Sequence, residues 1–149
     1  MSTNKPVKPA DRASADQVSD ESGAPVYWPT LTAEEAEDEW PALREWVDQL
    51  LIRFPHCARV PQCWWRHNDL VELFSALRDH ERASFASTAS AAAATDWHRA
   101  FRDVELRAEM WIRRFTCSVP GRDHTGSSDL EDWSAFVVAD VETRRLGGR

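Results

Sequence analysis

The segment "WHRAFRDVELRAEMWIRRF", residues 97 to 115, decides the fold. Its large apolar side chains recur every three or four residues, so they fall on one face of an α-helix. That stripe consists of Trp97, Phe101, Val104, Ala108, Trp111 and Phe115, widened by Ile112. Charged residues such as Arg99, Arg102 and Arg107 fall on other faces. We therefore predict a long amphipathic helix that covers a core with its apolar face.

A similar pattern lies between residues 32 and 54. Thr32 and Glu35 fit a capping box, in which a hydroxyl and a carboxylate each satisfy a backbone amide at the start of a helix. Pro41 fits the beginning of a second segment, and Pro55 ends that segment. Its apolar face comprises Leu43, Trp46, Val47, Leu50, Leu51 and Phe54.

Two further helices are predicted. One is capped by His67 or Asn68, and its apolar face is Leu70, Val71, Phe74 and Leu77. A second capping box, Ser128 with Glu131, begins the last helix, and its apolar face is Leu130, Trp133, Val137 and Val141. Residues 83 to 95 are small and alanine-rich, which indicates a frayed helix end followed by a linker or by an extension into the next helix. Because no alternating strand pattern is present, we predict an all-α fold, a small bundle of four or five helices.

The charge is concentrated near the beginning of the chain. The formal net charge is −7, and residues 1 to 39 carry three basic against nine acidic side chains. Residues 1 to 26 are polar and contain few large apolar side chains, so we predict a disordered acidic tail followed by one helical domain, residues 27 to 146. General DNA binding is not expected, because it relies on basic patches that neutralise phosphates.

The cysteines and the apolar runs indicate the compartment. The three cysteines are an odd number, and residues 1 to 24 lack the apolar core of a secretory signal. We therefore predict a cytoplasmic protein with free thiols. No apolar run approaches the roughly 18 residues of a transmembrane helix, so no membrane association is expected.

The segment "CWWRHNDLVELFSAL", residues 63 to 77, is the strongest candidate for a site. Adjacent helical side chains point about 100° apart, so Trp64 and Trp65 cannot both face one core from a helix. From a loop they can wedge on two sides as core anchors. Exposed, they would be a docking site for a partner, since tryptophan is enriched at such places.

Charged and metal-ligating residues offer other interpretations. Arg113, Arg114 and Arg122 form the best basic cluster, either a phosphate contact or an exposed helix end. The acidic run from Glu34 to Glu39 is either a solvated helix start or a phosphate mimic. Zinc would need four ligands from Cys57, Cys63, His67, Cys117 and His124. Cys63 and His67 are also spaced for a thiol with a base, but no motif for catalysis accompanies them, so an enzyme is not expected.

The sequence also resembles an uncharacterised domain family of actinobacteria, whose members are often encoded on plasmids, integrative elements and phages. The shared residues are Trp46, Val47, Trp64, Trp65, His67, Trp97, Phe115, Cys117 and His124, over roughly residues 40 to 124. Two positions depart from the family pattern: Pro61 stands where a cysteine is usual, and Phe101 where a histidine is common. The resemblance implies a mobile-element setting and no particular chemistry.

We therefore expect a non-catalytic adaptor or regulatory domain of an actinobacterial mobile element, without a cofactor. Its partner would be a protein of a plasmid, transfer or phage process. The expected docking residues are Trp64, Trp65, His67, Arg113 and Arg114. The alternative is a small zinc-stabilised or nucleic-acid-associated regulator, and an exposed 97–115 stripe would instead favour a homodimer.

Overall fold

The computed structural model describes residues 23–56, 60–114 and 127–147. Within these ranges the chain forms two short 3-10 helices, η1 (Trp28–Thr30) and η2 (Trp64–Arg66). The four α-helices there are α1 (Ala33–Arg53), α2 (Asn68–Ser84), α3 (Ala93–Arg114) and α4 (Ser127–Gly147). No strand occurs in the same ranges, so the predicted all-α class is confirmed. None of these helices is long and apolar enough to cross a lipid bilayer.

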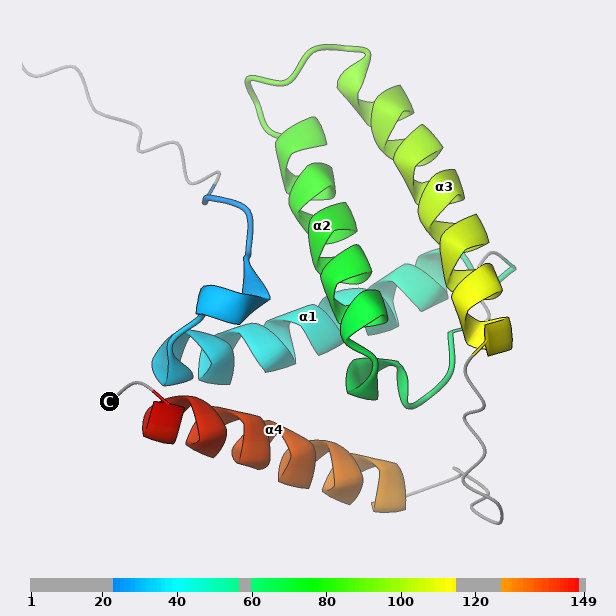
Figure 1. Cartoon of the computed structure of the whole chain (residues 1–149). Helices are drawn as coiled ribbons and strands as arrows, with labels where there is room; N and C mark the ends of the chain where they lie inside the picture. Colours follow the sequence, from blue (N-terminus) through cyan, green and yellow to red (C-terminus); the bar gives the residue numbers. More distant parts are fainter. Residues whose placement is uncertain (1–22, 57–59, 115–126, 148–149) are drawn as a thin grey trace, which may run out of the picture.

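The helices form two pairs that cross each other (Figure 1). α2 and α3 lie side by side as an antiparallel hairpin, and α1 and α4 lie side by side next to it. The beginning of α1 and the end of α4 therefore meet at one end of the molecule, close to η1 (Figure 1). Segments more than 100 residues apart in the sequence become neighbours there.

One aromatic core joins the two pairs. Six of the eight tryptophans are buried: Trp28, Trp40, Trp64, Trp65, Trp97 and Trp133. Trp40 of α1 meets Trp133 of α4 edge-on, with 5.7 Å between the ring centroids. Within α3, Trp97 stacks on Phe101 at 5.4 Å. Because each aromatic side chain buries roughly 150–250 Å², these rings contribute much of the apolar burial that stabilises the fold.

The first helix begins where the sequence predicts and continues further than predicted. Thr32 Oγ1 accepts from the Glu35 amide at 3.2 Å, and Glu35 Oε2 accepts from the Thr32 amide at 2.8 Å. These bonds, the backbone one first, lower the pKa of the Glu35 carboxyl. The prediction that Pro41 begins a second segment is wrong, because α1 runs through it to Arg53. Pro41 is exposed, and burial of Trp40, Leu43 and Val47 on the other side offsets the roughly 3 kcal/mol cost of an interior proline.

The predicted stripe of α3 is confirmed within the described residues. Trp97, Phe101, Val104 and Ala108 are buried, and α3 packs along α2, while Phe115 lies outside the described residues. The alanine-rich segment enters α3 at Ala93, as expected. His67 is the N-cap residue of α2, but its side chain makes no capping hydrogen bond.

The last helix departs more from its prediction. α4 begins at Ser127, so Ser128 lies inside the helix and is not its N-cap residue. Trp133 and Val141 are buried as predicted, whereas Leu130 is 60% exposed. The helix is also apolar on its outer side, where Val138 and Leu146 are exposed. The spacing of apolar residues alone therefore does not determine which side of α4 is buried.

The described part of the chain begins at Gly23, before the predicted domain boundary at Tyr27. The predicted disordered tail, residues 1 to 26, lies mostly outside the described residues, which start at Gly23. The Val26 amide donates to Asp79 Oδ2 of α2 at 2.8 Å, and the Val26 side chain packs against the core. The boundary moves because a backbone amide of this segment finds a partner on α2.

Candidate functional site

Trp64 and Trp65 occupy the η2 turn that leads into α2. The Trp64 amide donates to the Pro61 carbonyl and the His67 amide to the Trp64 carbonyl, each at 3.0 Å. The turn directs Trp64 against Phe74 of α2, at 5.6 Å, and Trp65 against Phe136 of α4, at 4.9 Å. The two indoles are only 4% and 2% exposed, so the core-anchor interpretation is confirmed. The structure does not support their assignment as docking residues, because both rings pack inside the core and neither lines one of the cavities described below.

Cys63 and His67 flank this turn and lie together. Cys63 Sγ is 3.8 Å from His67 Nε2, and both side chains are partly buried. Desolvation by burial lowers the pKa of His67 below 6.5, although the nearby Asp69 carboxylate opposes this shift. A largely neutral imidazole beside a thiol is suited to accept its proton or to share a metal ion.

The other predicted zinc ligands, Cys57, Cys117 and His124, lie outside the described residues. Within the described ranges, no group of three or more histidine, cysteine or acidic side chains is placed to hold a metal ion. The zinc hypothesis therefore stays a prediction, supported by two neighbouring ligands.

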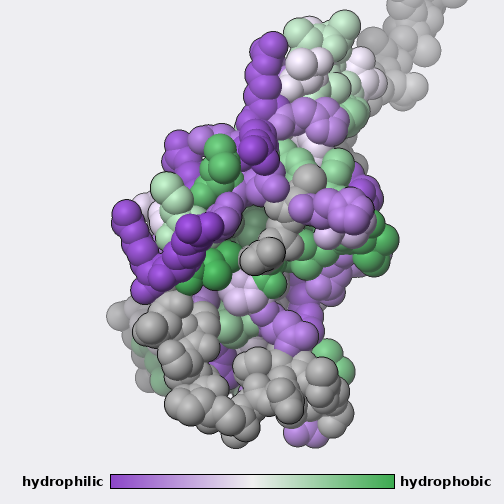
Figure 2. Space-filling model, turned by 90° about the vertical axis from the view of Figure 1, so that its right-hand side faces the viewer, coloured by the Kyte–Doolittle hydropathy of each residue, from purple (hydrophilic) through white to green (hydrophobic). Residues whose placement is uncertain are grey.

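The basic cluster at the end of α3 is exposed. Arg113 Nη2 is 2.6 Å from Glu109 Oε1, one turn earlier on the same helix. Three more arginines of α3 pair within the helix, Arg99 with Asp96, Arg102 with Glu105 and Arg107 with Asp103. Hydrophilic and hydrophobic side chains are interspersed on the side of the molecule where α3 lies (Figure 2). Four of the five arginines of α3 thus compensate neighbouring carboxylates. Arg114 is exposed and has no ion-pair partner among the described residues, so this helix end carries one uncompensated positive charge, and Arg122 lies outside the described residues.

The solvent face of α1 is different. Glu34, Asp38 and Glu45 are exposed at positions separated by whole turns of the helix. None of the three has an ion-pair or hydrogen-bond partner within the described residues. Glu37, to one side, pairs with Arg145 of α4 at 3.2 Å. We name Glu34, Asp38 and Glu45 the acidic face of α1.

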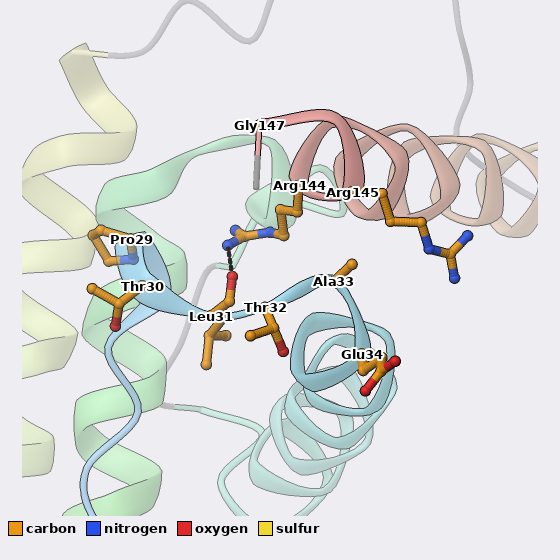
Figure 3. A pocket seen from close by; sticks show the side chains of 9 residues that line it. All are labelled: Pro29, Thr30, Leu31, Thr32, Ala33, Glu34, Arg144, Arg145 and Gly147. Carbon is orange, nitrogen blue, oxygen red and sulfur yellow. Dashed lines mark hydrogen bonds between the residues drawn. The ribbon is translucent and has the colours of Figure 1, made fainter. Parts of the chain in front are cut away.

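A cavity of about 610 Å³ lies between the segment before α1 and the last turn of α4 (Figure 3). Its lining is Pro29, Thr30, Leu31, Thr32, Ala33, Glu34, Arg144, Arg145 and Gly147. The Arg144 side chain reaches across toward Leu31, while the Arg145 side chain points away from Leu31 (Figure 3). Since Arg145 pairs with Glu37 and Glu142, its charge is already compensated.

Arg144 and Asp140 fasten α4 to the beginning of the fold. Arg144 Nη1 donates to the carbonyls of Trp28 and Leu31, at 2.9 and 3.0 Å. Its Nε donates to Asp140 Oδ2 at 2.8 Å, and the same carboxylate oxygen accepts from Trp40 Nε1 at 2.8 Å. The paired charges are half-buried, and charge-assisted hydrogen bonds of this kind are stronger than neutral ones.

A second cavity, of about 300 Å³, shares Arg144 and Pro29 with the lining of the first. We name it the aromatic cavity because it lies between η1, α1, α2 and α4, with two indoles and a phenyl ring in its lining. That lining is Trp28, Pro29, Trp40, Asn68, Val71, Glu72, Phe136, Asp140 and Arg144. A small concave site with aromatic walls and a few polar groups is the usual form of a binding pocket.

Sequence reasoning did not single out Trp40, Glu72 or Asp140 as site residues. The unused signal is the four-residue spacing of Asp140 and Arg144, which is compatible with an ion pair on one helix face. It carried no information about the carbonyls of Trp28 and Leu31, which are more than 100 residues away.

Comparisons with protein-family models, with curated proteins and with solved structures find no match to this chain. The geometry described above is therefore the basis for the functional proposal.

Proposed function

We propose that the chain is a non-catalytic protein-interaction domain, adaptor or regulatory, that docks a basic surface of a partner protein. The observation that carries this proposal is the acidic face of α1, three exposed carboxylates without a partner in the described part of the chain. Uncompensated charge of one sign raises the association rate with an oppositely charged partner and disfavours partners of like charge. Nucleic acid has like charge, which favours a protein as the partner.

The setting of this interaction follows from the resemblance and the composition. The Trp-Trp-x-His pattern of Trp64, Trp65 and His67 supports an origin on an actinobacterial plasmid, integrative element or phage. We place the partner among proteins of replication, transfer or phage development, in the cytoplasm. Homodimer formation through the 97–115 stripe is not part of the proposal, because its described core-facing residues are used within one chain.

The proposal is tested with two variants that change the net charge equally. Asp38→Asn with Glu45→Gln neutralises the acidic face of α1, and Asp103→Asn with Glu109→Gln neutralises two exposed carboxylates of α3. Tagged proteins capture partners from an actinobacterial lysate with and without nuclease, and mass spectrometry quantifies them. We expect the α1 variant to bind a nuclease-resistant partner about two- to thirtyfold more weakly, since each of the two exposed charges contributes about 0.2–1 kcal/mol, and the α3 variant to retain it.

Equal retention by both variants would contradict docking at the acidic face. A partner set that disappears with nuclease would favour the nucleic-acid-associated alternative. The Cys63–His67 contact of 3.8 Å supports the zinc-stabilised alternative. Elemental analysis finding one zinc per chain would establish that alternative, and loss of the zinc in Cys63→Ser would place it at this contact.

A further inference from the structure

We infer that the aromatic cavity binds the side chain of an arginine or lysine, an aliphatic chain with a single positive charge. The inference rests on the proposed function at one point, where a basic segment of the partner protein is taken as the source of this side chain. The cavity lies where η1, α1, α2 and α4 meet, and its volume is about 300 Å³. That volume is at the lower end for ligand pockets and fits one long side chain.

Three aromatic rings form part of the cavity wall, and they are held in place. Trp28 Nε1 donates to Ser75 Oγ at 2.6 Å, and Trp40 Nε1 donates to Asp140 Oδ2 at 2.8 Å. Because an indole has only this one donor, both rings offer a ligand only their apolar carbon surface. Phe136, 5.3 Å from Trp40 between ring centroids, adds a third ring, which has no polar atom. The walls therefore suit the hydrocarbon part of a ligand.

Most of the charge in the lining is already compensated. Arg144 donates to Asp140 and to the carbonyls of Trp28 and Leu31. Asp140 in turn accepts from Arg144 and Trp40 through one oxygen. These two opposite charges cancel to first order, so they select neither a cation nor an anion.

Glu72 makes the cavity selective for a positively charged ligand. It lies on α2, is exposed, and has no ion-pair or hydrogen-bond partner among the described residues. The cavity thus combines hydrocarbon walls with one uncompensated carboxylate. Arginine and lysine side chains match both features, since their aliphatic stems lie along apolar surface while the head group stays at the wet rim. A charge-assisted hydrogen bond to Glu72 then holds the head group.

The test uses the full chain and a matched pair of small probes. N-acetyl-arginine N-methylamide carries the guanidinium, and N-acetyl-citrulline N-methylamide has nearly the same shape without the charge. Each is titrated while the indole N–H signals of Trp28 and Trp40 are followed by NMR. We expect saturable shifts of both signals with the arginine probe. We expect about tenfold weaker binding of the citrulline probe, which corresponds to the loss of one charge-assisted hydrogen bond.

Two variants locate the effect. Glu72→Gln changes an exposed side chain and is expected to weaken the arginine probe about tenfold, to the level of citrulline. Glu109→Gln removes an exposed carboxylate of α3, outside the cavity lining and outside the acidic face of α1, and is expected to leave the titration unchanged. Equal binding of the two probes, unchanged binding by Glu72→Gln, or no saturable shift of the two indoles would overturn the inference. Partner docking at α1 is measured separately, so its failure and the failure of the cavity are distinguishable.

Discussion

α3 and α4 are helices of nearly equal length, 22 and 21 residues, yet different contacts hold them in place. α3 packs along α2 with Trp97, Phe101 and Val104 buried on one face, and its solvent side is mostly charged, with Leu106 and Met110 as exposed apolar exceptions. α4 has apolar residues on more than one side, and Val138 and Leu146 remain exposed. Its last turns are fixed by Arg144 and Asp140, which bond to the segment before α1 and to Trp40.

The comparison shows two ways of positioning a helix. An apolar stripe buries itself against any suitable partner surface, so its energy is spread over many weak contacts. A polar network is directional, so it selects one particular position among several similar apolar ones. α4 needs the second kind of contact because its own pattern is ambiguous.

The largest expected effect is on the α3 contact. Trp97→Ala removes a buried indole and is expected to lower the free energy of unfolding by about 3–5 kcal/mol. Leu106→Ala, at an exposed position of the same helix, is expected to change it by less than about 0.5 kcal/mol. Urea denaturation of both variants measures the difference. A comparable loss in both variants would show that the stripe is not the core-facing side.

The next effect concerns the network of α4. Arg144→Met keeps the aliphatic stem but leaves the carbonyls of Trp28 and Leu31 and the Asp140 carboxylate without this donor. We expect a loss of about 1.5–3 kcal/mol. Amide hydrogen exchange is expected to rise in the last turns of α4 and to stay unchanged in α3. Arg145→Met, at an exposed ion pair, is the control and is expected to cost about 0–1 kcal/mol. Unchanged exchange in α4 would refute the fastening role.

The third effect is the pH dependence of stability at the η2 turn. Phe136 of α4 packs against Trp65 of this turn. Burial lowers the pKa of His67 below 6.5, so the unfolded chain binds a proton more readily than the folded one. The stability linked to His67 is therefore complete above pH 6.5 and declines as pH falls toward the folded-state pKa.

His67→Asn isolates this contribution. We expect the urea midpoint of the wild-type chain to fall more than that of the variant between about pH 7.5 and pH 5.5. Asparagine at an N-cap position stabilises a helix. It therefore shifts the midpoint of the variant at about pH 7.5 and at about pH 5.5 by the same amount and adds no pH dependence in this range. Parallel pH profiles of the two proteins would argue against a proton-linked role of His67.

The smallest effects concern surface ion pairs, which are expected not to distinguish the two helices. Glu109→Gln breaks the pair with Arg113 on α3, and Glu142→Gln breaks the pair with Arg145 on α4. Each exposed pair on a helix is expected to contribute about 0.2–0.5 kcal/mol. Thermal unfolding of both variants checks this, and a loss above about 1 kcal/mol in either one would mean that its pair belongs to a larger network.

The candidate sites were harder to predict than the helices. The adjacent rings of Trp64 and Trp65 left two interpretations open, core anchors or docking residues, and only the structure shows both rings buried on two sides. The closeness of Cys63 and His67 followed from their spacing. The aromatic cavity did not, because its lining comes from η1, α1, α2 and α4, and no local pattern relates Trp28 and Glu72 to Asp140.

The sequence by itself determined the all-α class, the capping box of α1 and the buried stripe of α3, because these depend on interactions within a few residues of the chain. Only the tertiary structure decided that α1 continues through Pro41, which side of α4 is buried, and where Arg144 finds its acceptors. Those outcomes depend on contacts between distant segments. Helical periodicity records which side chains share a face, and it contains no information about the surface that the face will meet.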